Sequence, residues 1–210
     1  MWSEQIIMML LEGIKDTLYM TLTSTLIGYV IGLPMGILLT VTDKDGIHPN
    51  AAVYKVLDVI ANLIRSVPFL ILLIVLIPFT RFLIGRSYGP TATIVPLVIA
   101  AAPYIARMVE SSLKEVDAGV IEAARSMGAS NFTIVTKVML VEARTSLIVG
   151  ATISLGTILG YSAMAGTVGG GGLGDIAIRY GYTRWQTDIM IVTVILLVIL
   201  FQIFQTIGMK

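Results

Sequence analysis

The sequence predicts an all-α, polytopic membrane protein with five transmembrane helices. Hydrophobic residues make up 56% of the 210 residues and charged residues only 13%, and the mean hydropathy is +0.91. Ordinary soluble domains carry roughly 25% charged residues. A formal net charge of +1 gives no basic surface for a nucleic acid, so no nucleic-acid partner is expected.

The five expected spans are uncharged stretches, interrupted only by Arg65 in the second. Each reaches the roughly 20 apolar residues that cross a hydrocarbon core of about 30 Å. The bilayer offers the backbone no hydrogen-bond partners, so these stretches must be helices. We expect the first to be a true span and not a cleaved signal peptide, because it is too long and no basic segment precedes it. The expected spans are 17–42, 59–80, 87–106, 145–168 and 189–209, in a single transmembrane domain of residues 1–210.

The distribution of basic residues predicts the orientation, because Lys and Arg concentrate on the cytoplasmic side. With five spans, nine of the 14 basic residues fall on one side. This places the N-terminus outside and the C-terminus in the cytoplasm. The nine are Lys44, Lys55, Arg65, Arg107, Lys114, Arg125, Lys137, Arg144 and Lys210; the other side has Lys15, Arg81, Arg86, Arg179 and Arg184.

Small residues recur every four positions in the first span, at Ser24, Gly28, Gly32 and Gly36. They clear one face of the helix, so that another backbone can approach closely. The face predicts either packing within the chain or dimerisation with a second copy.

Prolines 34, 68, 78, 96 and 103 lie in or near spans, where they remove backbone donors and can kink helices, as in many transport pathways.

The polar segment of about 111–144 lies between the third and fourth spans, on the expected cytoplasmic side. Asp117 is a suitable helix N-cap, and Gly128 can adopt the left-handed conformation that ends a helix. Between them a short amphipathic helix is predicted, which either docks in a groove of a soluble partner or rests on the membrane surface. Its apolar face is Val120, Ile121, Ala124 and Met127.

This segment resembles the EAA loop of ABC importer permeases, whose pattern is E-A-A, three residues, G, nine residues and I-x-L-P. In that family the loop forms the coupling helix, which seats in a cleft of the ATP-hydrolysing subunit. The resemblance implies a type I ABC importer permease fold. It also implies that the residues coupling the chain to an ATPase are Glu122, Ala123, Ala124, Arg125 and Gly128.

The end of the loop departs from the family pattern. Val138-Met139-Leu140 has valine for the usual isoleucine, and Val141 stands where proline is usual. Proline would pre-set the backbone for the next helix, so we expect a softer helix start there and intact coupling.

Further segments along nearly the whole chain resemble the methionine ABC transporter permeases in particular. These are Arg65–Phe69, Ile77–Arg81, Ala101–Glu110, Gly160–Met164 and the glycine-rich Gly169–Tyr182. The resemblance implies a bacterial inner-membrane subunit that imports L- or D-methionine, or both, by alternating access. Two copies would pair with two ATPase subunits and a substrate-binding protein or lipoprotein, in contact with membrane lipid.

The resemblance leaves the chain without an enzyme activity or a cofactor of its own, because ATP and magnesium would belong to the ATPase. No G-x-x-x-x-G-K-[ST] pattern occurs in the sequence. The alternatives are a permease for another amino acid or small osmolyte, and a membrane scaffold or channel unrelated to ABC transporters. Both would keep the spans. A permease for another solute would keep the ATPase as the partner of the polar segment, whereas a scaffold or channel would give the segment a different partner.

Candidate pathway residues are Tyr161, Ser162 and Met164, two hydroxyl groups and a thioether within an apolar span. The same residues could instead serve interhelical packing.

The match of Gly169, Gly171 and Gly174 to G-x-G-x-x-G is expected to mark a hinge or gate and not a dinucleotide site, because no strand pattern precedes it. No metal site is expected, since His48 stands alone in a loop. Arg107 and Glu110 predict an ion pair on a helix surface.

Overall fold

The computed structural model describes residues 4–208, which form helices with no strand among them. The elements in chain order are α1 (Glu4–Thr42), α2 (Ala51–Ser66), α3 (Phe69–Val75), α4 (Ile77–Ile84), α5 (Pro90–Lys114), α6 (Ala118–Ser126), α7 (Asn131–Thr133), a π-helical turn (Ile134–Met139), α8 (Leu140–Glu142), α9 (Arg144–Ala165), a 3-10 turn (Gly166–Val168), α10 (Gly172–Ile176), a second π-helical turn (Ala177–Tyr182) and α11 (Thr187–Gly208).

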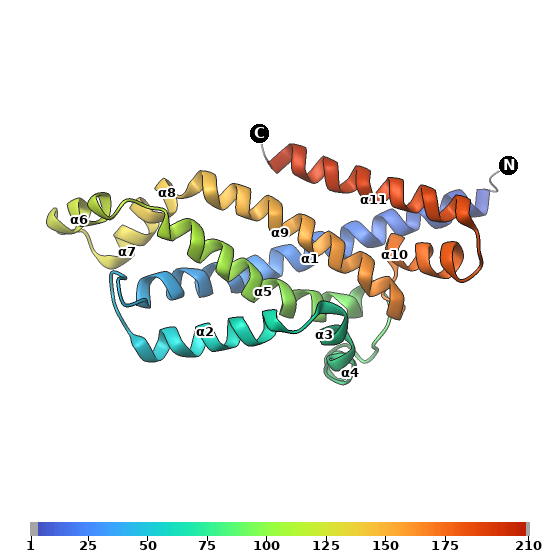
Figure 1. Cartoon of the computed structure of the whole chain (residues 1–210), viewed down its shortest axis with the longest axis horizontal. Coiled ribbons are helices and arrows are strands. Elements are labelled where there is room, and N and C mark those ends of the chain that lie inside the picture. Colours follow the sequence, from blue (N-terminus) through green and yellow to red (C-terminus); the bar gives the residue numbers. More distant parts are fainter. Residues whose placement is uncertain (1–3, 209–210) are drawn as a thin grey trace.

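Three long helices, α1, α5 and α9, form the centre of the molecule (Figure 1). α2 packs against α1 and α5, and α11 packs against α9. The largest fully buried side chains include Met20, Leu97, Ile105 and Ile158, which come from these three central helices. α6 and α7 lie at one end of the bundle, and the start of α1 and α10 lie at the other.

Within residues 4–208, four helical stretches are long and apolar enough to cross a membrane: Glu4–Thr42, Pro90–Lys114, Arg144–Tyr182 and Thr187–Gly208. α2 and α3 together would make a fifth, although they are bent by 101° against each other. The expected number of five spans is reached when this bent pair counts as one span.

The expected span 59–80 is not one helix. α2 ends at Ser66, and Val67 has an extended backbone, with φ −86° and ψ 125°. The ring of Pro68 disfavours a helical conformation at the residue before it, so the chain turns sharply there. α3 and α4 follow as short helices, with Pro78 in the first turn of α4.

The first and third helices extend beyond the expected spans. α1 begins at Glu4 and not at residue 17, and α5 continues past residue 106 to Lys114. Charged residues marked the limits of the expected spans, but a helix continues through them where its backbone bonds are intact. Met209, the end of the fifth expected span, and Lys210 lie outside the described residues.

The small-residue face of α1 packs within the chain, against α5. A Cβ atom on Gly32 would lie 2.6 Å from the backbone oxygen of Ala102, and one on Gly36 would lie 2.5 Å from that of Ala106. Real Cβ atoms do not approach so closely, so only glycine fits at these positions. Of the two alternatives for this face, packing within the chain is therefore confirmed.

Charged side chains join α2, α5 and the end of α1 at the end of the bundle where α6 lies. Arg107 forms an ion pair with Asp58, and its Nη1 lies 2.6 Å from Oε2 of Glu110. Lys114 Nζ lies 2.8 Å from Oε1 of Glu110 and 2.7 Å from Oδ2 of Asp43. The hydrogen bond from Lys114 holds the pKa of the Asp43 carboxyl below its ordinary value.

The predicted surface pair of Arg107 and Glu110 is therefore wrong in one respect. Glu110 is only 5% exposed, because α2 and the end of α1 cover it. Its carboxylate accepts bonds from two cations, Arg107 and Lys114, and so holds the centre of a chain of ion pairs.

Replacing Glu110 by alanine should destabilise the protein strongly. Glu110→Ala leaves Arg107 and Lys114 without their shared partner, and breaking a buried ion pair costs about 3–5 kcal/mol. Thermal unfolding of the purified chain in detergent measures the effect. Glu115→Ala, at an exposed carboxylate just beyond α5, is the matched control, and equal unfolding temperatures for both variants would contradict the structural role of Glu110.

The contact between α1 and α5 should not tolerate a single added methyl group. Gly32→Ala forces the two helices apart, and overpacking of this kind costs about 1–3 kcal/mol. The control is Gly160→Ala, because a Cβ atom there meets nothing within 4 Å. The unfolding temperature in detergent should fall for Gly32→Ala and stay level or rise slightly for Gly160→Ala. The reverse order would show that this contact is not tight.

Candidate coupling interface

α6 has defined ends, as the sequence predicts. The Asp117 side chain accepts a hydrogen bond of 2.8 Å from the backbone N–H of Gly119 and so caps the first turn. Gly128 has a φ of +81° and its N–H donates to the Arg125 carbonyl at 3.0 Å, while Ala129 N–H donates to the Ala124 carbonyl at 3.1 Å. This pair of bonds is the Schellman motif, which needs a left-handed residue at the position of Gly128.

Only half of the predicted apolar face of α6 is covered. Ala124 is buried and Ile121 packs partly buried against the core. Val120 and Met127 are exposed, and Met127 is 82% exposed. They lie at the edge of the stripe that points away from the rest of the chain. An apolar edge therefore stays available for a partner or a membrane surface.

Phe132, 78% exposed in α7, adds to the apolar surface at this end. Sequence reasoning missed it, because the predicted apolar face ended at Met127 and did not include the residues after Gly128. A signal was present: a large aromatic residue stands among polar residues four positions after the glycine that ends α6.

The five predicted coupling residues do not point the same way. Glu122 and Ala123 are exposed, whereas Ala124 is buried against the core. Arg125 turns back toward its own chain, where its Nη2 donates to the carbonyl oxygen of Ile47 at 2.9 Å. Gly128 shapes the end of the helix. Of the five, Ala124 alone is buried; Arg125 and Gly128 are exposed like Glu122 and Ala123, but Arg125 bonds to its own chain and Gly128 ends the helix.

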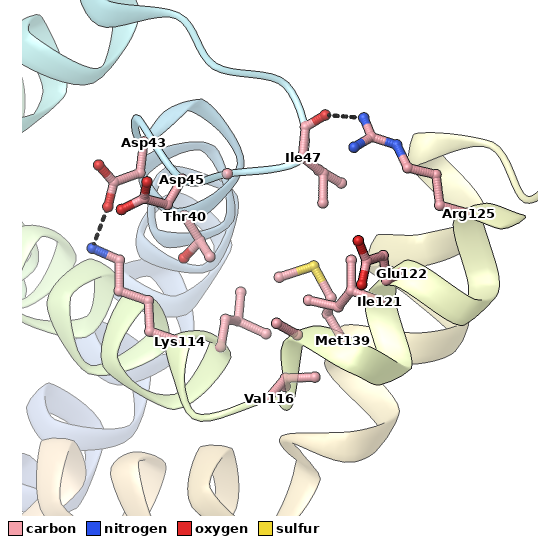
Figure 2. A pocket seen from close by; sticks show the side chains of 13 residues that line it. Thr40, Asp43, Asp45, Ile47, Lys114, Val116, Ile121, Glu122, Arg125 and Met139 are labelled. Atoms are coloured by element: carbon pink, nitrogen blue, oxygen red, sulfur yellow. Dashed lines mark hydrogen bonds and ion pairs between the residues drawn. The ribbon is translucent and has the colours of Figure 1, made fainter.

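A cavity of about 600 Å³ separates α6 from the connection between α1 and α2 (Figure 2). Ile121 and Met139 lie on its apolar side, next to Val116 at the end of α5. The hydrogen bond from Arg125 to Ile47 crosses one side, and the ion pair between Lys114 and Asp43 lies on another. Glu122 also lines this cavity.

The position of Val141 does not mark a helix start. The chain passes through the π-helical turn Ile134–Met139 into α8, which contains Val141, and α9 begins at Arg144. A proline at residue 141 would fall inside a helical stretch already under way, so the expected softening has no counterpart at that residue.

The candidate pathway residues have three different surroundings. The ring of Tyr161 stacks on Phe69 of α3, with centroids 4.4 Å apart. Ser162 is buried and donates to the Leu159 carbonyl at 2.8 Å, within its own helix. Met164 is half exposed. The structure therefore does not gather the three around one cavity.

The glycine-rich segment forms a tightly packed turn. Gly169, Gly171 and Gly172 have positive φ, and a Cβ atom on Gly174 would lie 2.1 Å from the carbonyl oxygen of Ala163. The following α10 packs on α1, where the Leu173 N–H donates to Thr17 Oγ1 at 2.9 Å. Here glycine serves sharp turning and close packing, and the expected role of the segment as a hinge or gate stays a prediction.

Comparison with known proteins gives concordant results. The model of the family of binding-protein-dependent transport system inner membrane components matches residues 13–208. The probable D-methionine transport system permease protein MetI of Vibrio cholerae is 48% identical over 200 residues, which cover 95% of this chain and 89% of that protein. The corresponding Escherichia coli K12 protein is 51% identical over 164 residues, which cover 78% and 76%.

Solved structures agree with this result. A chain of the MetNI methionine ABC transporter, solved in inward facing conformations, matches with a TM-score of 0.96 and 49% identity, covering 99% of this chain and 96% of that one. An amino acid ABC transporter crystallised with histidines shares the fold, with a TM-score of 0.79 at 22% identity over 97% and 92% of the two chains. The chain therefore belongs to the family of inner membrane components of binding-protein-dependent transport systems, among the methionine ABC transporter permeases.

Proposed function

We propose that this chain is the membrane-spanning permease subunit of an ATP-binding-cassette importer that takes up methionine. The observation that carries the proposal is α6, a capped helix at one end of the bundle that exposes Glu122 and Ala123 in an EAA pattern. Methionine, as the D-enantiomer, the L-enantiomer or both, is supported by relatives named as D-methionine permeases that match most of this chain.

The proposed complex contains two copies of this chain, two ATPase subunits, and a substrate-binding protein or lipoprotein. α6 docks in a cleft of the ATPase in the manner of a helix in a groove. Val120, Met127 and Phe132 provide exposed apolar surface beside Glu122. ATP and magnesium bind to the ATPase subunits, and this chain supplies the pathway.

Alternating access follows from this arrangement. ATP draws the two ATPase subunits together, and the α6 helices of the two copies move with them. The central helices α1, α5 and α9 then move as packed units, because their contacts with one another are close. The pathway opens toward the outside, and hydrolysis returns it to the inward-open state.

In the membrane, residues 1–210 form a single transmembrane domain with the N-terminus outside and the C-terminus in the cytoplasm. Two observations support this placement: the excess of Lys and Arg at the end that carries α6, and the position of the start of α1 at the opposite end of the bundle. α11 is the least covered of the candidate spans, with 11% of its apolar window buried, so it contacts lipid or another chain.

We assign the substrate route to the stretch of α9 that contains Tyr161, Ser162 and Met164. Met164 is the member of this group that presents its side chain outward. Its thioether is polarisable and can contact the apolar side chain of methionine. Ser162 supports the route indirectly, by fixing α9 against Thr21 of α1 at 3.5 Å.

Reversing the charge of Glu122 should detach the ATPase. Glu122→Lys places a cation on the exposed face of α6, and every 1.4 kcal/mol of lost docking free energy lowers the affinity about tenfold. Co-purification of the ATPase and methionine uptake should both fall at least tenfold, with unchanged membrane insertion. Glu142→Lys, at an exposed carboxylate in α8, is the control. Normal uptake by Glu122→Lys would contradict the docking role of α6.

Uptake of radiolabelled methionine at micromolar concentration tests the substrate directly. Cells whose high-affinity route is this chain, with its ATPase and binding protein, should accumulate methionine only when all three chains are present. Separate labelling of the L- and D-enantiomers resolves the preference. A stable complex with the ATPase that takes up no methionine would retain the importer and assign it another amino acid or small osmolyte.

A further inference from the structure

The connection between α1 and α2, residues 43–50, is a folded loop attached to both helices. His48 N–H donates to the Val41 carbonyl at 3.0 Å, and Asn50 N–H donates to the Thr42 carbonyl at 2.9 Å, so the loop folds back on the end of α1. The side chain of Asn50 caps α2 by accepting from Val53 N–H at 3.1 Å. A displacement of this loop therefore displaces both helices.

The loop is also closely packed. A Cβ atom on Gly46 would lie 2.4 Å from the Val41 carbonyl oxygen. The Ile47 side chain is only 7% exposed and belongs to the same buried cluster as Leu113 and Ala124. The carbonyl oxygen of Ile47 therefore has a fixed position from which it accepts the hydrogen bond of Arg125.

The cavity described above lies between this loop and α6. A displacement of α6 toward the loop would be absorbed by a decrease in the volume of this cavity, about 600 Å³, and would not reach the loop. A side chain that spans the cavity prevents this. Arg125 is that side chain: it starts on α6, and its guanidinium reaches Ile47 at 2.9 Å along one side of the cavity (Figure 2). Lys114 fixes the loop from α5 through Asp43 and so holds its other side.

We propose that Arg125 is a positioning residue that transmits the displacement of α6 to α1 and α2 through Ile47 and the loop 43–50. The inference rests on the proposed function, and it separates Arg125 from Glu122 and Ala123. Glu122 and Ala123 have the proposed docking role, whereas Arg125, although its side chain is also exposed, bonds to the carbonyl oxygen of Ile47 in its own chain. A guanidinium suits this role because it keeps its charge and offers several donors in a planar group.

Three variants of the complete transporter in proteoliposomes test the proposal. Arg125→Ala should keep the ATPase bound while methionine uptake per ATP hydrolysed falls about tenfold or more, because hydrogen bonds from charged donors are the strong ones. Arg125→Lys retains a charged donor and should recover part of the loss. Lys137→Ala, at an exposed cation of the same segment, should match the parent.

Each contrary outcome has a distinct meaning. Loss of ATPase binding by Arg125→Ala, as expected for Glu122→Lys, would overturn the proposal by placing Arg125 at the interface with the ATPase. Unchanged uptake per ATP would overturn it as well. Failure of the parent complex to bind the ATPase or to transport any solute would refute the proposed function itself, before any variant is compared.

A distance measurement tests the same inference without transport. The sequence contains no cysteine, so Asp45→Cys in the loop and Ser126→Cys on α6 can carry spin labels selectively. The spin–spin distance in the complex should be equal with and without ATP when Arg125 is present. It should shorten with ATP in the Arg125→Ala background as the gap closes. A distance that changes equally in both backgrounds would overturn the role of Arg125.

Discussion

The close approach of α1 to α5 is the contact on which the rest of this arrangement depends. Lipid tails are as apolar as leucine side chains. Helices in a bilayer therefore gain little free energy of association from hydrophobic burial, and they depend on close packing. Gly32 and Gly36 supply that packing by bringing the two backbones together. The position of α5 then brings Glu110 and Lys114 beside the end of α1, where Asp43 completes the chain of ion pairs. α6 begins shortly after α5, so its position derives from the same contact.

α6 has two functional sides, and its short motif reflects both of them. Ala124 must be small because it is buried against the core, and Gly128 must be glycine-like because its φ is positive. Glu122 and Ala123 remain exposed. A pattern that looks like one recognition sequence therefore combines residues for an outside partner with residues that attach the helix to its own chain.

The sequence predicted the apolar helices, the N-cap at Asp117 and the left-handed Gly128 because each depends on local chemistry. It did not predict the break at Val67 as a change of direction by 101°, since a proline within a span can also leave the helix merely kinked. The ion pair of Arg107 and the hydrogen bond of Arg125 depend on residues more than 40 positions away, namely Asp58 and Ile47. Spacing along one helix holds no information about such partners.

The π-helical turn Ile134–Met139 has a consequence for how this chain can vary. Such a turn accommodates one residue more than an α-helical turn of the same length. An α-helix rotates by about 100° per residue, at 3.6 residues per turn. Deleting one residue here would convert the turn into a regular helix and swing the preceding α6 around the axis of α9 by about that angle. A change in the length of this turn would therefore alter the direction in which α6 faces.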